Sequence, residues 1–143
     1  MAEKKIEDFK ITLPQLRYLR QLEKRKLAEL TRRKEIAVRL MVENTMVKDS
    51  LAELSKGNKD TIIPLGAGIY IKGGITPSSF QRTLPGNVVL PSTKEEVEKE
   101  LVARDKIYVN DLTQLDKEIL STKQNLDEMN ALFRMSTQHI RKK

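Results

Sequence analysis

The sequence predicts an α+β protein in which two long helices form an antiparallel coiled coil and two short β-hairpins connect them. Apolar residues recur at heptad spacing on both sides of the middle of the chain, and neither flank contains glycine, which is typical of long paired helices. All six glycines lie between residues 57 and 86, near β-branched residues, which predicts the hairpins. We expect a single domain, residues 1–143, with an N-terminal helical segment at 1–56, hairpins at 60–91 and a C-terminal helix at 92–143.

The first helix is predicted from about Leu13 to Ser55. Proline is tolerated only in the first turn of a helix, so Pro14 marks the start, and Gly57-Asn58 suits the end. From Leu16 a 3-4 spacing visits twelve positions, of which eight are apolar: Leu16, Leu19, Leu30, Ala37, Leu40, Val47, Leu51 and Leu54. This spacing predicts the apolar seam of a left-handed coiled coil.

The second helix begins near "PSTKEEVEKEL" at residues 91–101, where either Ser92 with Glu95 or Thr93 with Glu96 can form a capping box. Its seam visits twelve positions from Leu101, and nine are apolar: Leu101, Tyr108, Leu112, Leu115, Ile119, Leu126, Met129, Phe133 and Ile140. The helices have similar lengths, so we expect them to fold back on each other and to bring both ends of the chain together.

The connector at residues 60–91 is predicted to form two hairpins. "TIIPL" and "IYIKGGI" flank "GAG", and "FQRTL" and "VVL" flank the turn Pro85-Gly86-Asn87. Hairpins of this size are marginal alone in water. We therefore expect strands of other subunits to close a shared sheet or barrel with them. The residues predicted to carry this assembly are Ile62, Ile63, Leu65, Gly66, Gly68, Ile69, Ile71, Leu84, Gly86, Val88 and Val89.

The composition, with 33% charged and 4% aromatic residues, suits solvated helices better than a thick globular core. The absence of cysteine excludes disulfides and thiolate metal sites, and it fits a reducing compartment. The sequence shows no apolar run of membrane-spanning length and no secretory signal, so we expect a cytoplasmic protein that does not contact a membrane.

The net charge of +7 is concentrated at the two ends of the chain. Residues 1–35 contain eleven Lys and Arg against six Asp and Glu, and residues 134–143 contain four against none. If the helices are antiparallel, these two basic segments converge.

We expect no enzymatic activity, no cofactor and no bound metal. The glycines do not form a phosphate-binding loop or a dinucleotide fingerprint. His139 is the only histidine and has no candidate co-ligands nearby in the sequence. The carboxylates are spread along helix faces that should be solvated, and no Ser or Thr has an evident base partner.

The stretch "IIPLGAGIYIKGGI" at residues 62–75 is similar to the first hairpin region of α-class prefoldin subunits, archaeal or eukaryotic. The second unit, "FQRTLPGNVVLPSTKEEVEKEL", favours the α class because β-class subunits have a single hairpin. The resemblance implies a hexamer of two α-class and four β-class subunits, whose hairpins form a β-barrel platform. The coiled coils would hold unfolded polypeptides at their tips and transfer them to a group II chaperonin without ATP.

If the family resemblance is applied to this chain, the tip of its coiled coil combines roughly residues 6–30 with residues 125–143. The apolar residues proposed to contact clients are Leu13, Leu16, Leu19, Leu132, Phe133, Met135 and Ile140. Those on the predicted seams, which are Leu16, Leu19, Phe133 and Ile140, could instead pack one helix on the other. The basic residues that could steer acidic clients toward the tip are Arg17, Arg20, Lys24, Arg25, Lys26, Arg134, Arg141, Lys142 and Lys143.

Two other functions stay open from the residues alone. Converging basic ends could bind nucleic acid or the ribosome through phosphate contacts, although few aromatic residues are present for base stacking. The chain could also be a structural spacer, but that function would leave the two hairpins unexplained.

Overall fold

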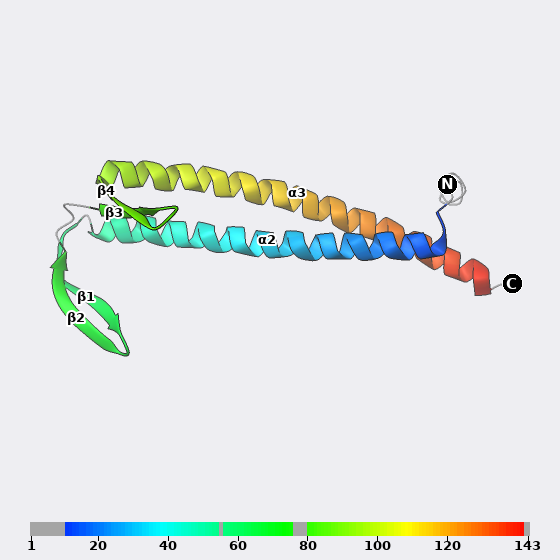
Figure 1. The fold of residues 1–143 in the computed structure, drawn as a ribbon, viewed down its shortest axis with the longest axis horizontal. Coiled ribbons are helices and arrows are strands. Elements are labelled where there is room, and N and C mark those ends of the chain that lie inside the picture. The colour runs from blue at the N-terminus through cyan, green and yellow to red at the C-terminus, as the bar shows by residue number, and fades with distance from the viewer. Residues whose placement is uncertain (1–10, 55, 76–79, 142–143) are drawn as a thin grey trace. The chain divides into compact units, whose positions relative to one another are not determined.

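The structure is a computed structural model that describes residues 11–54, 56–75 and 80–141. The elements follow the order α2 (Leu13–Leu54), β1 (Asn58–Gly66), β2 (Ile69–Ile75), β3 (Phe80–Leu84), β4 (Val88–Ser92) and α3 (Lys94–Arg141) (Figure 1). The prediction of an α+β chain with two long helices and two hairpins is confirmed. In the described part of the chain, neither helix carries an apolar window able to cross a bilayer.

The chain divides into two compact units. The terminal unit comprises Met1–Val38 and Asn110–Lys143, and the hairpin unit comprises Arg39–Val109. Each unit contains part of both helices, and the hairpins belong to the second.

Side-chain caps define the start of each helix. The backbone N–H of Thr12 donates to Gln15 Oε1 at 2.9 Å, and the N–H of Gln15 donates to Thr12 Oγ1 at 3.4 Å, so a capping box spans Pro14. At α3 the same reciprocal pair joins Thr93 and Glu96, at 3.2 and 3.3 Å. Of the two caps that the sequence left open, the structure therefore uses the second.

In the terminal unit the helices pack antiparallel. Leu30 and Ala37 of α2 form a buried cluster with Leu115 of α3, and Leu112 and Ile119 pack against it. Lys34 Nζ lies 2.6 Å from Asp116 Oδ1 at the edge of this cluster. Burial of this narrow stripe is the main source of helix stability here, because isolated helices in water are marginal.

The seam predicted for α3 is confirmed, since every predicted position from Leu101 to Ser136 is buried or half-buried. The seam predicted for α2 is only half right. The predicted positions 16, 23, 30, 37, 44, 51 and 54 are buried or half-buried, but Leu19, Lys26, Arg33, Leu40 and Val47 are exposed.

The residues that replace these five at the helix interface are each one position further along: Arg20, Leu27, Lys34, Met41 and Lys48. Long cationic side chains can cover apolar surface with their stems while their charged ends reach partners. Here Arg20 reaches Phe133, Lys34 reaches Asp116 and Lys48 reaches Asp105. Counting only apolar letters misses this use of basic residues.

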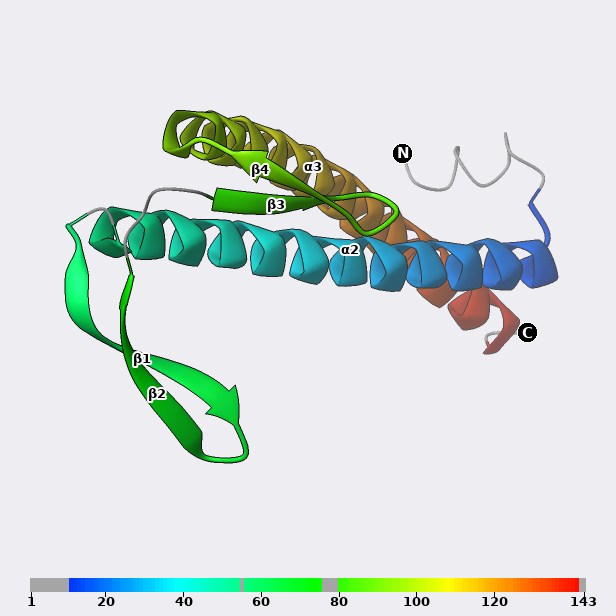
Figure 2. The same cartoon turned by 60° about the vertical axis from the view of Figure 1, so that its left-hand side comes forward.

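Each hairpin is a separate two-stranded antiparallel sheet. Ala67 and Gly68 form the turn between β1 and β2 with φ of 49° and 75°, and Gly86 and Asn87 adopt φ of 89° and 59° between β3 and β4. The first turn has two residues between the paired Gly66 and Ile69, and the second has three between the paired Leu84 and Val88. The left-handed angles in both favour glycine and asparagine. The two views in Figures 1 and 2 show both ribbons as distinct hairpins.

Candidate functional site

The apolar residues predicted to contact clients lie at the start of α2 and near the end of α3, within the terminal unit. Leu19 is exposed at 37%, whereas Leu16 is buried at 6%. Leu13, Leu132, Phe133 and Met135 are half-buried. Leu16 therefore packs within the helix pair, as the alternative interpretation of the sequence had it. The side chain of Ile140 lies outside the described residues.

The basic residues of the same region are mostly exposed: Arg17, Lys24, Arg25, Lys26 and Arg134. Arg20 is half-buried. The side chain of Arg141, together with Lys142 and Lys143, lies outside the described residues. None of the ion pairs found among the described residues involves these six arginines and lysines.

Phe133 connects the apolar and basic sets. Arg17 Cζ lies 5.6 Å and Arg20 Cζ 4.6 Å from the centroid of its ring. A guanidinium within about 6 Å of a ring centroid is attracted by the ring quadrupole. The contacts join the first turns of α2 to the last turns of α3, so the predicted convergence of the two basic segments holds for the residues that the structure describes.

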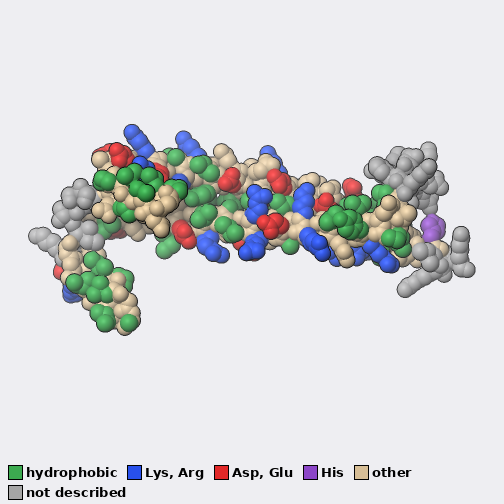
Figure 3. Space-filling view, in the orientation of Figure 1, with side chains coloured by type: hydrophobic (Ala, Val, Ile, Leu, Met, Phe, Trp, Pro, Cys, Tyr) green, Lys and Arg blue, Asp and Glu red, His purple; other side chains and the backbone are tan. Residues whose placement is uncertain are grey.

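Hairpin β1–β2 exposes apolar side chains on both of its faces. Ile63 pairs with Ile71 on one face, while Ile62 and Tyr70 lie on the other, opposite Lys72 and Pro64. The exposed fractions are 58% for Ile62, 50% for Ile71 and 64% for Tyr70. Leu65 and Ile69 near the turn are exposed as well. The space-filling view shows apolar side chains spread along this ribbon (Figure 3).

Hairpin β3–β4 differs because one of its faces is anchored to helices of its own unit. Phe80, Arg82 and Leu84 are half-buried, whereas the intervening Gln81 and Thr83 are exposed. On β4, Val88 and Val89 remain exposed at 52% and 53%. Among the residues predicted for assembly, Leu84 alone is half-buried within the single chain, and the others are exposed.

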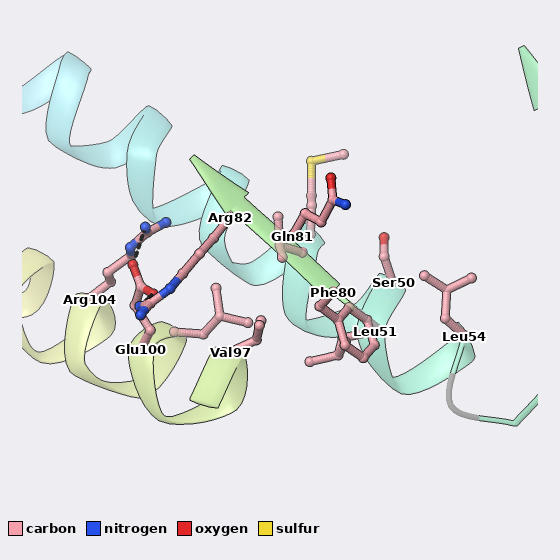
Figure 4. A pocket seen from close by; sticks show the side chains of 12 residues that line it. Ser50, Leu51, Leu54, Phe80, Gln81, Arg82, Val97, Glu100 and Arg104 are labelled. Carbon is pink, nitrogen blue, oxygen red and sulfur yellow. Dashed lines mark hydrogen bonds and ion pairs between the residues drawn. The ribbon is translucent and has the colours of Figure 1, made fainter. Parts of the chain in front are cut away.

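The anchor of β3 is ionic. Glu100 of α3 accepts a hydrogen bond from Arg82 Nη1 at 2.5 Å and another from Arg104 Nη2 at 2.5 Å (Figure 4). The hydrogen bond from Arg82 lowers the pKa of Glu100, burial partly opposes this shift, and Arg104 adds to it. The second hairpin is therefore held by a carboxylate that stays ionised at neutral pH.

A groove with a volume of about 370 Å³ opens beside this anchor. Its walls come from α2, β3 and α3, and they include Leu51, Phe80, Val97 and Leu101 (Figure 4). The walls are mainly apolar, and the Arg82–Glu100–Arg104 cluster closes one side. The arrangement offers mainly apolar packing surface.

Sequence reasoning missed a second polar cluster between the helices of the hairpin unit. Asn44 is buried, and its Nδ2 donates to the carbonyl of Leu101 at 3.0 Å and to Asp105 Oδ1 at 2.5 Å. Lys48 pairs with the same carboxylate. The signal was present, because Asn44 and Asp105 both fall on predicted seam positions, where a polar residue needs a partner across the interface.

Comparison with known proteins adds no assignment. Neither the family models searched nor the curated proteins gave a match to this chain. The resemblance to prefoldin therefore depends on the residues and elements described above.

Proposed function

We propose that this chain is an α-class prefoldin-like subunit of an ATP-independent chaperone. In this proposal the two helices form a coiled coil, and the hairpins join those of a second α-class subunit and of β-class subunits in a β-barrel platform. The assembly would be a cytoplasmic hexamer of two α-class and four β-class subunits. It would capture unfolded polypeptides and deliver them to a group II chaperonin.

The observation that carries the proposal is the two-faced apolar hairpin β1–β2. Ile62 and Tyr70 on one face and Ile63 and Ile71 on the other are all exposed. A ribbon of two strands cannot bury side chains of both faces by itself, and its outer edges also leave backbone groups unpaired. Other subunits would supply what the ribbon lacks, namely strands that pair with its edges and neighbouring elements that cover its faces.

The terminal unit supports the client-binding part of the proposal. It presents exposed apolar side chains, which are Tyr18, Leu19 and Leu22, beside the basic residues of α2. Exposed apolar surface of this kind can contact apolar segments of many sequences, which a holdase requires. The element order of helix, hairpin, hairpin and helix is the order that the family resemblance implies.

The test is an aggregation assay with the assembled complex. We expect the chain, co-assembled with a β-class prefoldin subunit, to suppress aggregation of a chemically denatured protein without ATP. Deletion of residues 1–23 and 131–143, which removes the predicted client-binding residues, should leave the complex assembled and abolish most of this suppression. Unchanged suppression by the truncated complex would show that the client site lies elsewhere.

A further inference from the structure

Two arginines in the terminal unit share one aromatic ring. Arg17 and Arg20 are three residues apart on α2, so they lie on the same side of that helix. Both approach the ring of Phe133 on α3, with Cζ at 5.6 and 4.6 Å from its centroid. The ring thus restricts both guanidinium groups to one small region, and they cover part of the ring that an apolar client would otherwise contact.

This arginine pair, Arg17 with Arg20, takes part in no ion pair within the described part of the chain. The ion pairs there use Lys34, Lys48, Lys56, Lys94, Arg82 and Arg104 instead. A guanidinium that interacts with a ring keeps its N–H groups for a second partner. Two such groups held close together repel each other, and a carboxylate bound between them would remove that repulsion and accept hydrogen bonds from both.

Exposed apolar side chains adjoin the arginine pair on the same turns of α2. Tyr18 is 62% exposed, Leu19 37% and Leu22 39%. A ligand that places a carboxylate on Arg17 and Arg20 would therefore bring its neighbouring residues against apolar surface. This combination suits an extended polypeptide in which acidic and apolar residues alternate closely.

We propose that Arg17 and Arg20, positioned by Phe133, form a receptor for Asp and Glu side chains of bound polypeptides, so that this subunit prefers acidic apolar segments. The inference rests on the proposed client-binding function and names its substrate class. A polypeptide is favoured over a nucleic acid because Asp127 and Glu128 are exposed on α3 within two turns of Phe133. They would repel a continuous run of phosphates more than an isolated carboxylate.

The test compares two leucine-rich peptides that are identical except that one carries glutamates where the other carries glutamines. Their binding to the assembled full-length complex is measured by fluorescence anisotropy at several salt concentrations. We expect the glutamate peptide to bind about tenfold more tightly, as one or two exposed charge-assisted hydrogen bonds would give. The double variant R17Q/R20Q should lose this preference while it still binds the glutamine peptide.

Two further variants separate the site from overall charge. R32Q/R33Q removes the same charge from exposed positions of α2 in the same unit, and it should keep the preference. Phe133→Leu keeps the charge and most of the apolar volume but removes the ring, so it should reduce the preference. Circular dichroism of each variant checks that the helices are intact.

Each alternative result has a distinct meaning. If the glutamine peptide binds and the glutamate peptide binds no more tightly, the acidic preference is wrong while client capture stands. If neither peptide binds, both proposals fail. If R32Q/R33Q abolishes the preference as fully as R17Q/R20Q, net charge and not this site is responsible. Tighter, R17Q/R20Q-sensitive binding of a short single-stranded RNA would overturn the assignment in favour of nucleic acid.

Discussion

Hairpin β1–β2 allows assembly to be weakened without disturbing the fold of the chain. Ile62 and Ile71 lie on opposite faces of the ribbon and are exposed at 58% and 50%. Replacing both by alanine keeps the turn glycines and the strand register. We therefore expect the secondary structure of the isolated chain to be unchanged and its free energy of unfolding to change by less than about 0.5 kcal/mol.

The expected loss of assembly follows from these exposed fractions. Burying an isoleucine side chain completely contributes about 1.5–3 kcal/mol. About half of each side chain is still exposed in the single chain, so association can gain about 1 kcal/mol from each isoleucine. Losing both costs about 2 kcal/mol for each subunit, which corresponds to a roughly 30-fold weaker association.

The assay is analytical ultracentrifugation of the chain with a β-class prefoldin subunit over a range of concentrations. Val42→Ala with Val102→Ala is the matched control, because those valines are exposed at 50% and 49% but belong to the helices. We expect the control to assemble as the unaltered chain does. Equal assembly by the hairpin variant would refute the reasoning that this ribbon is covered by other subunits.

Three further variants probe contacts within the chain by chemical denaturation. Leu115→Ala should lower the free energy of unfolding by about 2–3 kcal/mol, because it opens a cavity in the buried cluster between the helices; a loss under 1 kcal/mol would contradict that packing. Asn44→Ala should lower the free energy of unfolding by about 1–2 kcal/mol, because it removes the hydrogen bonds to Leu101 and Asp105. An unchanged free energy of unfolding would contradict a stabilising role for these hydrogen bonds. Glu100→Gln should cost about 1 kcal/mol at neutral pH, since Glu100 is partly exposed. The pKa of Glu100 in the folded chain lies below the ordinary 4.5, so its contribution to the free energy of unfolding should be complete at neutral pH and should disappear as the pH falls below 4.5. If the variant were still less stable than the wild type by the same amount in strong acid, this reasoning would be contradicted.

The sequence was sufficient to predict the secondary structure because the relevant signals are local. Pro14, the cap at residues 93–96 and the glycines of the turns each act over a few residues, and the structure places helix ends and turns at or close to them. The antiparallel contacts of the helices also follow from heptad spacing and similar lengths. The coiled coil, the barrel and the single-domain organisation stay predictions.

The register of α2 at the interface could not be predicted in the same way. The heptad spacing places Leu19 and Lys26 on the predicted seam, yet the structure uses Arg20 and Leu27. The choice depends on what α3 presents opposite, such as Phe133 for Arg20, and such contacts join residues more than a hundred positions apart. A single sequence carries no direct signal for pairs of that separation.

The candidate site was predicted in its location more than in its details. The basic and apolar residues of the tip were named, and the burial of Leu16 was one of the two alternatives, but the approach of Arg17 and Arg20 to the ring of Phe133 was not predicted. The anchor formed by Arg82, Glu100 and Arg104 also escaped prediction, because Arg82 lies on a strand and its partners on a helix. Ionic contacts between elements depend on packing angles that residue patterns do not encode.

Native mass spectrometry of the chain mixed with a β-class prefoldin subunit tests the central claim most directly, because the claim is that the uncovered hairpins require strands from other subunits. The account predicts a hexamer with two copies of this chain and four of its partner. A stable monomer that binds neither itself nor the β-class subunit would contradict it.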